Sequence, residues 1–211
     1  MRTLYLTVSS AFILTACGTS ESTSVNTGNS TAELTNNISK SNITKTYILK
    51  SDENNKLKWT GSAVRKEHFG SVNFDGFVNV ENGILKTGEI TFDLTSISSQ
   101  DLEGEWKQKL DAHLKDSAFF FTKKYPTASL KITNYDGSNI TGDLKIKDVT
   151  KKIIFPATVI IADTAFISTS SFKIDRTEYG IEYGSAKFFD LAKDKLISDE
   201  VKFDISLNTQ N

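Results

Sequence analysis

The side chains that could carry out chemistry are few in this sequence, which holds one cysteine and two histidines, His68 and His113. A metal site built on two histidines also needs a carboxylate ligand, and no ligand spacing such as His-Glu-X-X-His is present. A serine nucleophile would need a histidine base held by a third group, and the spacing supports no such grouping. We therefore predict that the protein is not an enzyme and has neither a metal nor a cofactor.

The cysteine, Cys17, ends a short N-terminal segment. Met1-Arg2 is followed by a mostly apolar run from Leu4 to Leu14, which is typical of a secretory signal and too short to span a bilayer as a mature helix. The ending Leu-Thr-Ala-Cys resembles the lipobox of bacterial lipoproteins, in which the cysteine is acylated and the signal is cut just before it. The resemblance implies a signal peptide over residues 1–16 and lipid attachment at Cys17. The alternative is a buried, inert cysteine.

The next segment, residues 17–45, is dominated by Ser, Thr, Asn and Gly. Such a segment has too little apolar surface to offset its ordering entropy, so we predict a flexible tether that holds the protein to a membrane. Gly18 follows the cysteine, where an aspartate would favour the inner membrane in enterobacteria. The expected location is therefore the bacterial cell envelope, lipid-anchored in the outer membrane and facing the periplasm.

Composition excludes several other classes of protein. The formal net charge of -1 argues against a nucleic-acid partner, which would require a basic excess. A single cysteine excludes a disulfide framework and a multi-cysteine zinc site. The length of 211 residues fits one folded domain, expected over residues 46–211, with the tether before it.

Residues 101–115 form the only convincing helical segment. Leu102, Trp106, Leu110 and Leu114 recur every four residues, so we expect them on one helical face. Asp101 stands where an N-cap would. Three phenylalanines follow at 119–121, and we expect a helical lid on a barrel with these rings near its mouth.

From Tyr47 onward, apolar and polar residues alternate with the period of strands that bury one face. The alternation predicts roughly eight strands joined by short turns, without a repeated βαβ unit. This pattern favours an all-β fold, an antiparallel barrel or sandwich. By parity, thirteen residues are expected to face inward: Val72, Phe74, Phe92, Leu94, Leu130, Ile132, Leu144, Ile146, Phe155, Val159, Phe172, Phe203 and Ile205.

Several segments resemble the YceI-like family, in the right order from about residue 57 to residue 207. They include WTGS and EHFG early in the domain, KLDAHLKD with FF and KYPT around the predicted helix, and GDLKIKDVTK and DRTEYG later. Each segment is short, and their order over nearly the whole folded part carries the resemblance.

The resemblance implies a lipocalin-like antiparallel barrel, with the helix inserted near its mouth, that encloses a long isoprenoid lipid such as a polyprenyl chain or a quinone tail. The thirteen inward residues would line the lumen, and the residues placed at the mouth are His68, His113, Phe119, Phe120 and Arg176. Alternation alone leaves open that side chains fill the interior. We expect a non-enzymatic carrier or store; the alternative is an envelope stress or interaction protein with a filled barrel. Pairing into a homodimer also stays open.

Overall fold

The computed structural model describes residues 43–64, 66–192 and 195–210. The predicted signal peptide, Cys17 and all but the end of the predicted tether lie outside the described residues. Within the described part of the chain, no helix is both long and apolar enough to cross a membrane.

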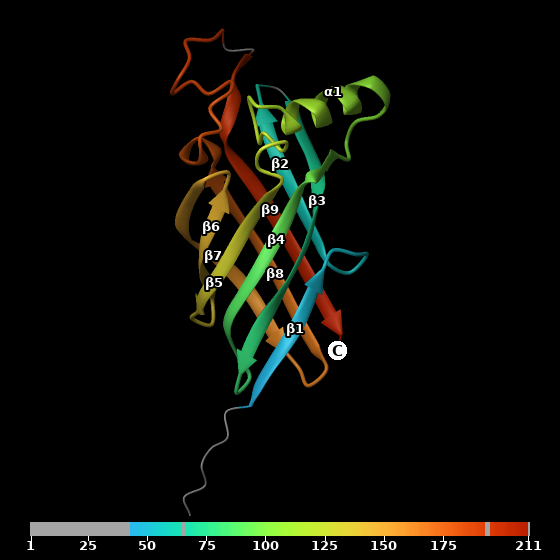
Figure 1. The fold of residues 1–211 in the computed structure, drawn as a ribbon, viewed down its shortest axis with the longest axis vertical. Coiled ribbons are helices and arrows are strands. Elements are labelled where there is room, and N and C mark those ends of the chain that lie inside the picture. The colour runs from blue at the N-terminus through green and yellow to red at the C-terminus, as the bar shows by residue number, and fades with distance from the viewer. Residues whose placement is uncertain (1–42, 65, 193–194, 211) are drawn as a thin grey trace, which may run out of the picture. The chain divides into compact units, whose positions relative to one another are not determined.

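The described residues contain nine antiparallel strands, one α-helix and one 3-10 helix, joined by turns and loops (Figure 1). In chain order they are β1 Thr44–Lys50, β2 Lys56–Ala63, β3 Lys66–Glu81, β4 Ile84–Ser99, α1 Gly104–Lys115, β5 Thr127–Tyr135, β6 Asn139–Ile146, β7 Val149–Ile161, β8 Ala165–Asp175, η1 Arg176–Tyr179 and β9 Ile197–Gln210.

The sheet closes into a barrel because β3 pairs with β4 on one edge and with both β1 and β2 on the other. Tyr47 of β1 lies opposite Val78, and Trp59 of β2 lies opposite Gly70. β1 and β2 are thus two halves of one strand, interrupted at residues 51–55. The nine described strands occupy eight positions, which confirms the predicted eight-stranded antiparallel barrel.

The register explains why alternation was informative. Leu130 of β5 lies opposite Ile90 of β4 on one side and Leu144 of β6 on the other. All three side chains are buried. Each strand therefore contributes every second residue to a common interior, as the pleat requires.

Helix α1 begins three residues later than predicted. The N-cap residue is Glu103, whose side chain makes no capping hydrogen bond. The expected cap, Asp101, instead accepts a hydrogen bond from the N–H of Phe69 (3.0 Å) and contacts Nδ1 of His68 (2.7 Å). Tertiary partners on β3 thus compete successfully with a local capping role.

The predicted apolar face of α1 is also partly wrong, because Trp106 is 71% exposed. Steps of four residues drift about 40° around a helix, so Trp106 rotates away from the buried Leu114. The contact face carries Lys107 and Asp111 instead. The carboxylate of Asp111 accepts from the N–H of Ser99 (2.6 Å), and Lys107 donates to the Ser99 carbonyl (2.5 Å) and to the Ser98 hydroxyl. Polar contacts therefore hold α1 to the end of β4.

Candidate ligand-binding site

An apolar cavity of about 110 Å³ lies inside the barrel at the end that carries α1. All strands except β1 contribute to its wall, together with α1, the turn after it and η1. The polar side chains in the wall belong to Arg176, Ser198 and Trp59, and the indole N–H of Trp59 is already bonded to the Ser71 carbonyl (3.3 Å). Among the described residues, no histidine, cysteine, carboxylate or lysine lines this cavity. The site can therefore hold an apolar group but offers no acid–base pair.

The structure places nine of the thirteen residues predicted for the lumen in the wall of this cavity. These nine are Val72, Phe92, Leu94, Leu130, Leu144, Ile146, Phe172, Phe203 and Ile205. The other four point inward but lie away from the wall. Phe74, Ile132 and Phe155 are buried, and Val159 is half-buried against the core. Period-two alternation identifies the inner face of a strand but not the position along the barrel axis where open space occurs.

Ten wall residues were missed by sequence reasoning: Leu57, Trp59, Gly61, Ile97, Leu114, Ala128, Ile153, Ile197, Ser198 and Val201. Parity could have found some of them, since Val201 shares the parity of Phe203 and Ile205. Gly61 and Ser198 carry no apolar signal. Their place in the wall follows from strand pairing at the mouth, which the sequence does not display.

Two phenylalanines predicted at the mouth, Phe119 and Phe120, line the cavity beside Leu114. Their rings pack edge to face, with centroids 5.6 Å apart. The turn after α1 presents them inward: the N–H of Phe120 bonds back to the Leu114 carbonyl (3.2 Å), and Phe121 adopts a positive φ of 51°. The chain thus folds back over the barrel end, and two aromatic rings close it.

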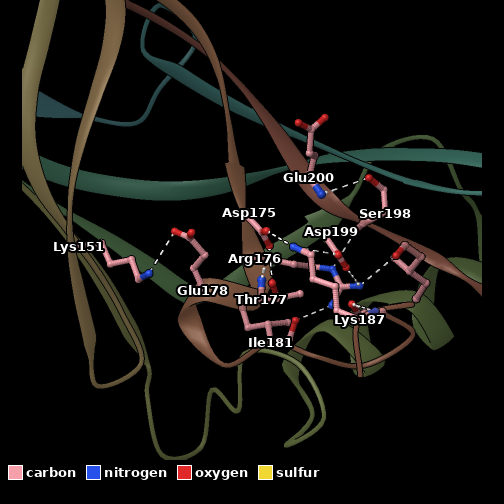
Figure 2. Close-up of polar contacts among 12 residues, drawn as sticks. Lys151, Asp175, Arg176, Thr177, Glu178, Ile181, Lys187, Ser198, Asp199 and Glu200 are labelled. Atoms are coloured by element: carbon pink, nitrogen blue, oxygen red, sulfur yellow. Dashed lines mark hydrogen bonds and ion pairs between the residues drawn. The ribbon is translucent and has the colours of Figure 1, made fainter. Parts of the chain in front are cut away.

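The third mouth residue that reaches the wall is Arg176, which is only 2% exposed. Its guanidinium donates to three backbone carbonyls, those of Ser198 (2.9 Å), Ile181 (2.5 Å) and Ile197 (3.2 Å) (Figure 2). Its carbon Cζ also lies 5.6 Å from the ring centroid of Phe119, a cation–π distance. Arg176 therefore joins the start of β9, the loop after η1 and the aromatic mouth.

The charge of Arg176 is balanced at the outer side of the mouth. Burial lowers the pKa of Arg176, whereas Asp199 and Asp175 act in the opposite direction. Asp199 lies 3.6 Å from Arg176 Nη2 and 3.3 Å from the ammonium of Lys187, which also contacts Asp175 at 2.5 Å (Figure 2). Arg176 thus forms an ion pair with Asp199, but its backbone acceptors are closer.

The two histidines have separate surroundings, and neither lines the cavity. His68 contacts Asp101, while the ring of His113 packs on Tyr183 (4.6 Å) and Phe119 (5.5 Å). Nε2 of His113 is buried without a hydrogen-bond partner among the described residues. In that part of the chain, no group of three or more His, Cys, Asp or Glu side chains is arranged to hold a metal ion.

Asp101→Asn is expected to lower the free energy of unfolding by about 1.5–3 kcal/mol at neutral pH, because charge-assisted hydrogen bonds to a partly buried carboxylate are lost. Burial raises the pKa of Asp101, but the hydrogen bonds from His68 and Phe69 outweigh this, so the pKa lies below the usual 3.8. A carboxyl with a lowered pKa stabilises the fold above its unfolded pKa and loses this effect as the pH falls through its folded pKa.

The difference between wild type and Asp101→Asn should therefore be full above about pH 4 and shrink below it, as followed by urea denaturation at several pH values. Asp75→Asn is the control, because Asp75 is an exposed carboxylate on the same strand as His68. A difference that stays constant down to pH 2 would contradict this account of Asp101.

The fold and the site define a class of protein, the lipocalin-like antiparallel barrel with an apolar interior and a helix at its mouth. The family is shown by the model of the YceI-like domain, which matches residues 39–209. The chain belongs to the YceI-like family, as its motifs predicted. No curated protein matches the sequence.

Solved structures of low sequence identity share the fold. BcnA of Burkholderia cenocepacia has a TM-score of 0.59 and 19% identity, covering 74% of this chain and 96% of its own. A polyisoprenoid binding domain from Saccharophagus degradans, implicated in plant cell wall breakdown, has a TM-score of 0.59 and 15% identity, covering 79% and 99%. The YCEI protein of Campylobacter jejuni has a TM-score of 0.52 and 19% identity, covering 65% and 81%.

Proposed function

We propose that this protein binds an isoprenoid lipid, such as a polyprenyl chain or the tail of a quinone, inside its barrel, as a carrier or store and not as an enzyme. The observation that carries the proposal is the cavity wall, which is apolar except for Arg176, Ser198 and the bonded indole of Trp59. A hydrocarbon tail is bound by removing its surface from water, at about 25 cal/mol per Å², and needs no reactive group.

The family and one structural neighbour support this choice of ligand. The neighbour from Saccharophagus degradans is described as a polyisoprenoid binding domain, and this chain shares its fold. The described wall also lacks a histidine, a carboxylate or a thiol that could act on a bound lipid. How long the bound tail is depends on the depth of the cavity.

We also propose that the protein is anchored by a lipid on Cys17 in the bacterial cell envelope, in the outer membrane facing the periplasm. The support is the sequence Leu-Thr-Ala-Cys with the signal-like segment before it. Metabolic labelling with a palmitate analogue tests this: the wild type should take up label, and Cys17→Ser should not. Label that persists in the variant, or is absent from the wild type, would overturn the anchor without affecting the proposal for the barrel.

The test of the binding proposal is mass spectrometry of an organic extract of the purified protein. We expect a prenyl lipid at a ratio near one per protein. An empty extract, together with no uptake of added quinone, would contradict the proposal and favour the alternative of an envelope interaction protein with a filled barrel.

A further inference from the structure

The loop that follows η1 forms part of the rim of the barrel, at the end that carries α1 (Figure 1). We call residues 181–192 the rim loop. Its base is fixed in the protein, because Ser185 is fully buried. The N–H groups of Phe188 and Phe189 both bond to the Ser185 carbonyl, at 3.3 Å and 3.1 Å. Backbone hydrogen bonds therefore give this part of the loop a defined conformation.

The rim loop arranges its side chains in the reverse of the usual order. The ammonium of Lys187 turns toward the barrel, where it contacts Asp175 (2.5 Å) and Asp199 (3.3 Å) (Figure 2). The rings of Phe188 and Phe189, in contrast, are 49% and 47% exposed. Neighbouring apolar side chains that a defined loop presents outward mark a surface that is covered by a partner.

Apolar side chains connect these rings with the ligand cavity. Ile197 lines the cavity inside the barrel and also an open groove on the outside of the rim. Val64 and Leu196 line the same groove, and the N–H of Val64 bonds to the Leu196 carbonyl (3.4 Å). Leu196 also lines a hollow together with Phe188 and Phe189. Apolar surface thus extends from the outside of the rim loop to the wall of the cavity.

The size and charge of this surface favour a lipid bilayer over a protein as the partner. Four large apolar side chains are 44–49% exposed here, those of Val64, Tyr183, Phe188 and Phe189. A stable protein interface takes about 20–30 residues from each side, whereas single aromatic side chains lie favourably at the membrane–water boundary. The rim loop has two carboxylates and one ammonium, which is already paired, so it offers no basic excess to anionic headgroups.

We propose that the rim loop docks on a zwitterionic lipid bilayer by inserting Phe188 and Phe189, so that the mouth of the barrel meets the membrane. This inference rests on the proposed function, because docking lets an isoprenoid tail pass between bilayer and cavity along apolar surface and not through water. The contact is separate from the proposed anchor at Cys17, which holds the chain near a membrane without orienting the mouth.

The experiment uses the full-length chain with Cys17→Ser, which has no attached lipid and no other cysteine. A cysteine introduced by Leu191→Cys carries a fluorophore that reports the polarity around the rim loop, and vesicles of phosphatidylcholine are added. We expect a blue shift that saturates with lipid concentration. The same label after Ile160→Cys should show no shift, because Ile160 is exposed beside the β7–β8 turn at the other end of the barrel.

The contribution of the phenyl rings is tested by Phe188→Ser combined with Phe189→Ser, with the label at residue 191. Affinity for the vesicles should fall by at least about tenfold, since the inserted apolar surface is removed. The matched control is Ile154→Ser with Ile160→Ser, which removes two exposed apolar side chains from the outer face of β7 and should change the affinity by no more than about twofold. Adding phosphatidylglycerol to the vesicles should have an equally small effect.

No blue shift at residue 191 in the chain with both phenylalanines, or an equal loss of affinity in the two double variants, would overturn the docking surface. A shift that follows protein concentration without vesicles would also overturn it and assign the rings to a second copy of the chain. The organic extract tests the cargo independently. Docking by a protein that neither yields a prenyl lipid nor takes up quinone would overturn the proposed function, whereas a prenyl lipid in the extract with no response at residue 191 would overturn the docking alone.

Discussion

Arg176→Ala is expected to lower the free energy of unfolding by about 3–5 kcal/mol, the usual cost of removing one partner from a buried charged cluster. The truncation leaves the carbonyls of Ser198, Ile181 and Ile197 without their donor. Ile181 is only 1% exposed, so water cannot replace the donor of its carbonyl unless the mouth opens. Urea denaturation at neutral pH measures the loss.

Two further variants separate the contribution of the guanidinium geometry to the free energy of unfolding from the contribution of the positive charge. Arg176→Lys keeps the cation but cannot serve three carbonyls with the geometry of a guanidinium, so most of the loss should remain. Lys187→Ala removes a side chain that is 52% exposed and should cost no more than about 1 kcal/mol. A loss of similar size for Arg176→Ala and Lys187→Ala would contradict the assigned role of the buried guanidinium.

The same cluster connects stability with the proposed binding. Arg176 lines the cavity and lies against Phe119, while its carbonyl acceptors are on the rim. The hydrogen bonds of Arg176 hold the mouth together, and this keeps Phe119 and Phe120 over the cavity. An apolar site closed in this way excludes water, which is what burial of a hydrocarbon tail requires.

Much of the fold could be predicted because strand alternation is local information. The parity of Phe92 and Leu94, or of Phe203 and Ile205, is set by the pleat alone, and the structure places all four in the wall. The motifs, taken in their order along the sequence, also indicated the family. Neither source reports the depth at which the interior closes, so Phe74 and Phe155 could not be distinguished from wall residues.

The errors at the helix have a related cause. Asp101 matched a capping position in sequence, but its partners, His68 and Phe69, are more than thirty residues away. Trp106 fits a four-residue spacing in the sequence. In the structure, however, Lys107 and Asp111 of α1 bond to the end of β4, and these contacts fix which face of α1 meets the barrel. Polar contacts with residues outside the helix decided both outcomes, and the periodicity of the helical segment carries no record of them.

Gly61→Leu is expected to abolish ligand uptake, or weaken it by at least about tenfold, while leaving the fold at least as stable as the wild type. Gly61 lines the cavity, and a Cβ built there meets no atom within 4 Å. Its backbone is also outside the left-handed region, so a leucine is tolerated. Glycine weakens a strand interior by about 0.5–1 kcal/mol, and the new side chain fills a void, so both effects favour the folded variant.

The measurement compares prenol affinity and thermal stability for Gly61→Leu and Ser62→Leu. The second variant adds the same side chain at the next residue, which points to the other face of β2 and does not line the cavity. Lost binding in Gly61→Leu alone, with a melting temperature no lower than that of the wild type, would place the ligand in the barrel. Wild-type affinity in a folded Gly61→Leu would mean that the ligand binds elsewhere, because a leucine side chain at Gly61 occupies space in the cavity that a bound tail would need.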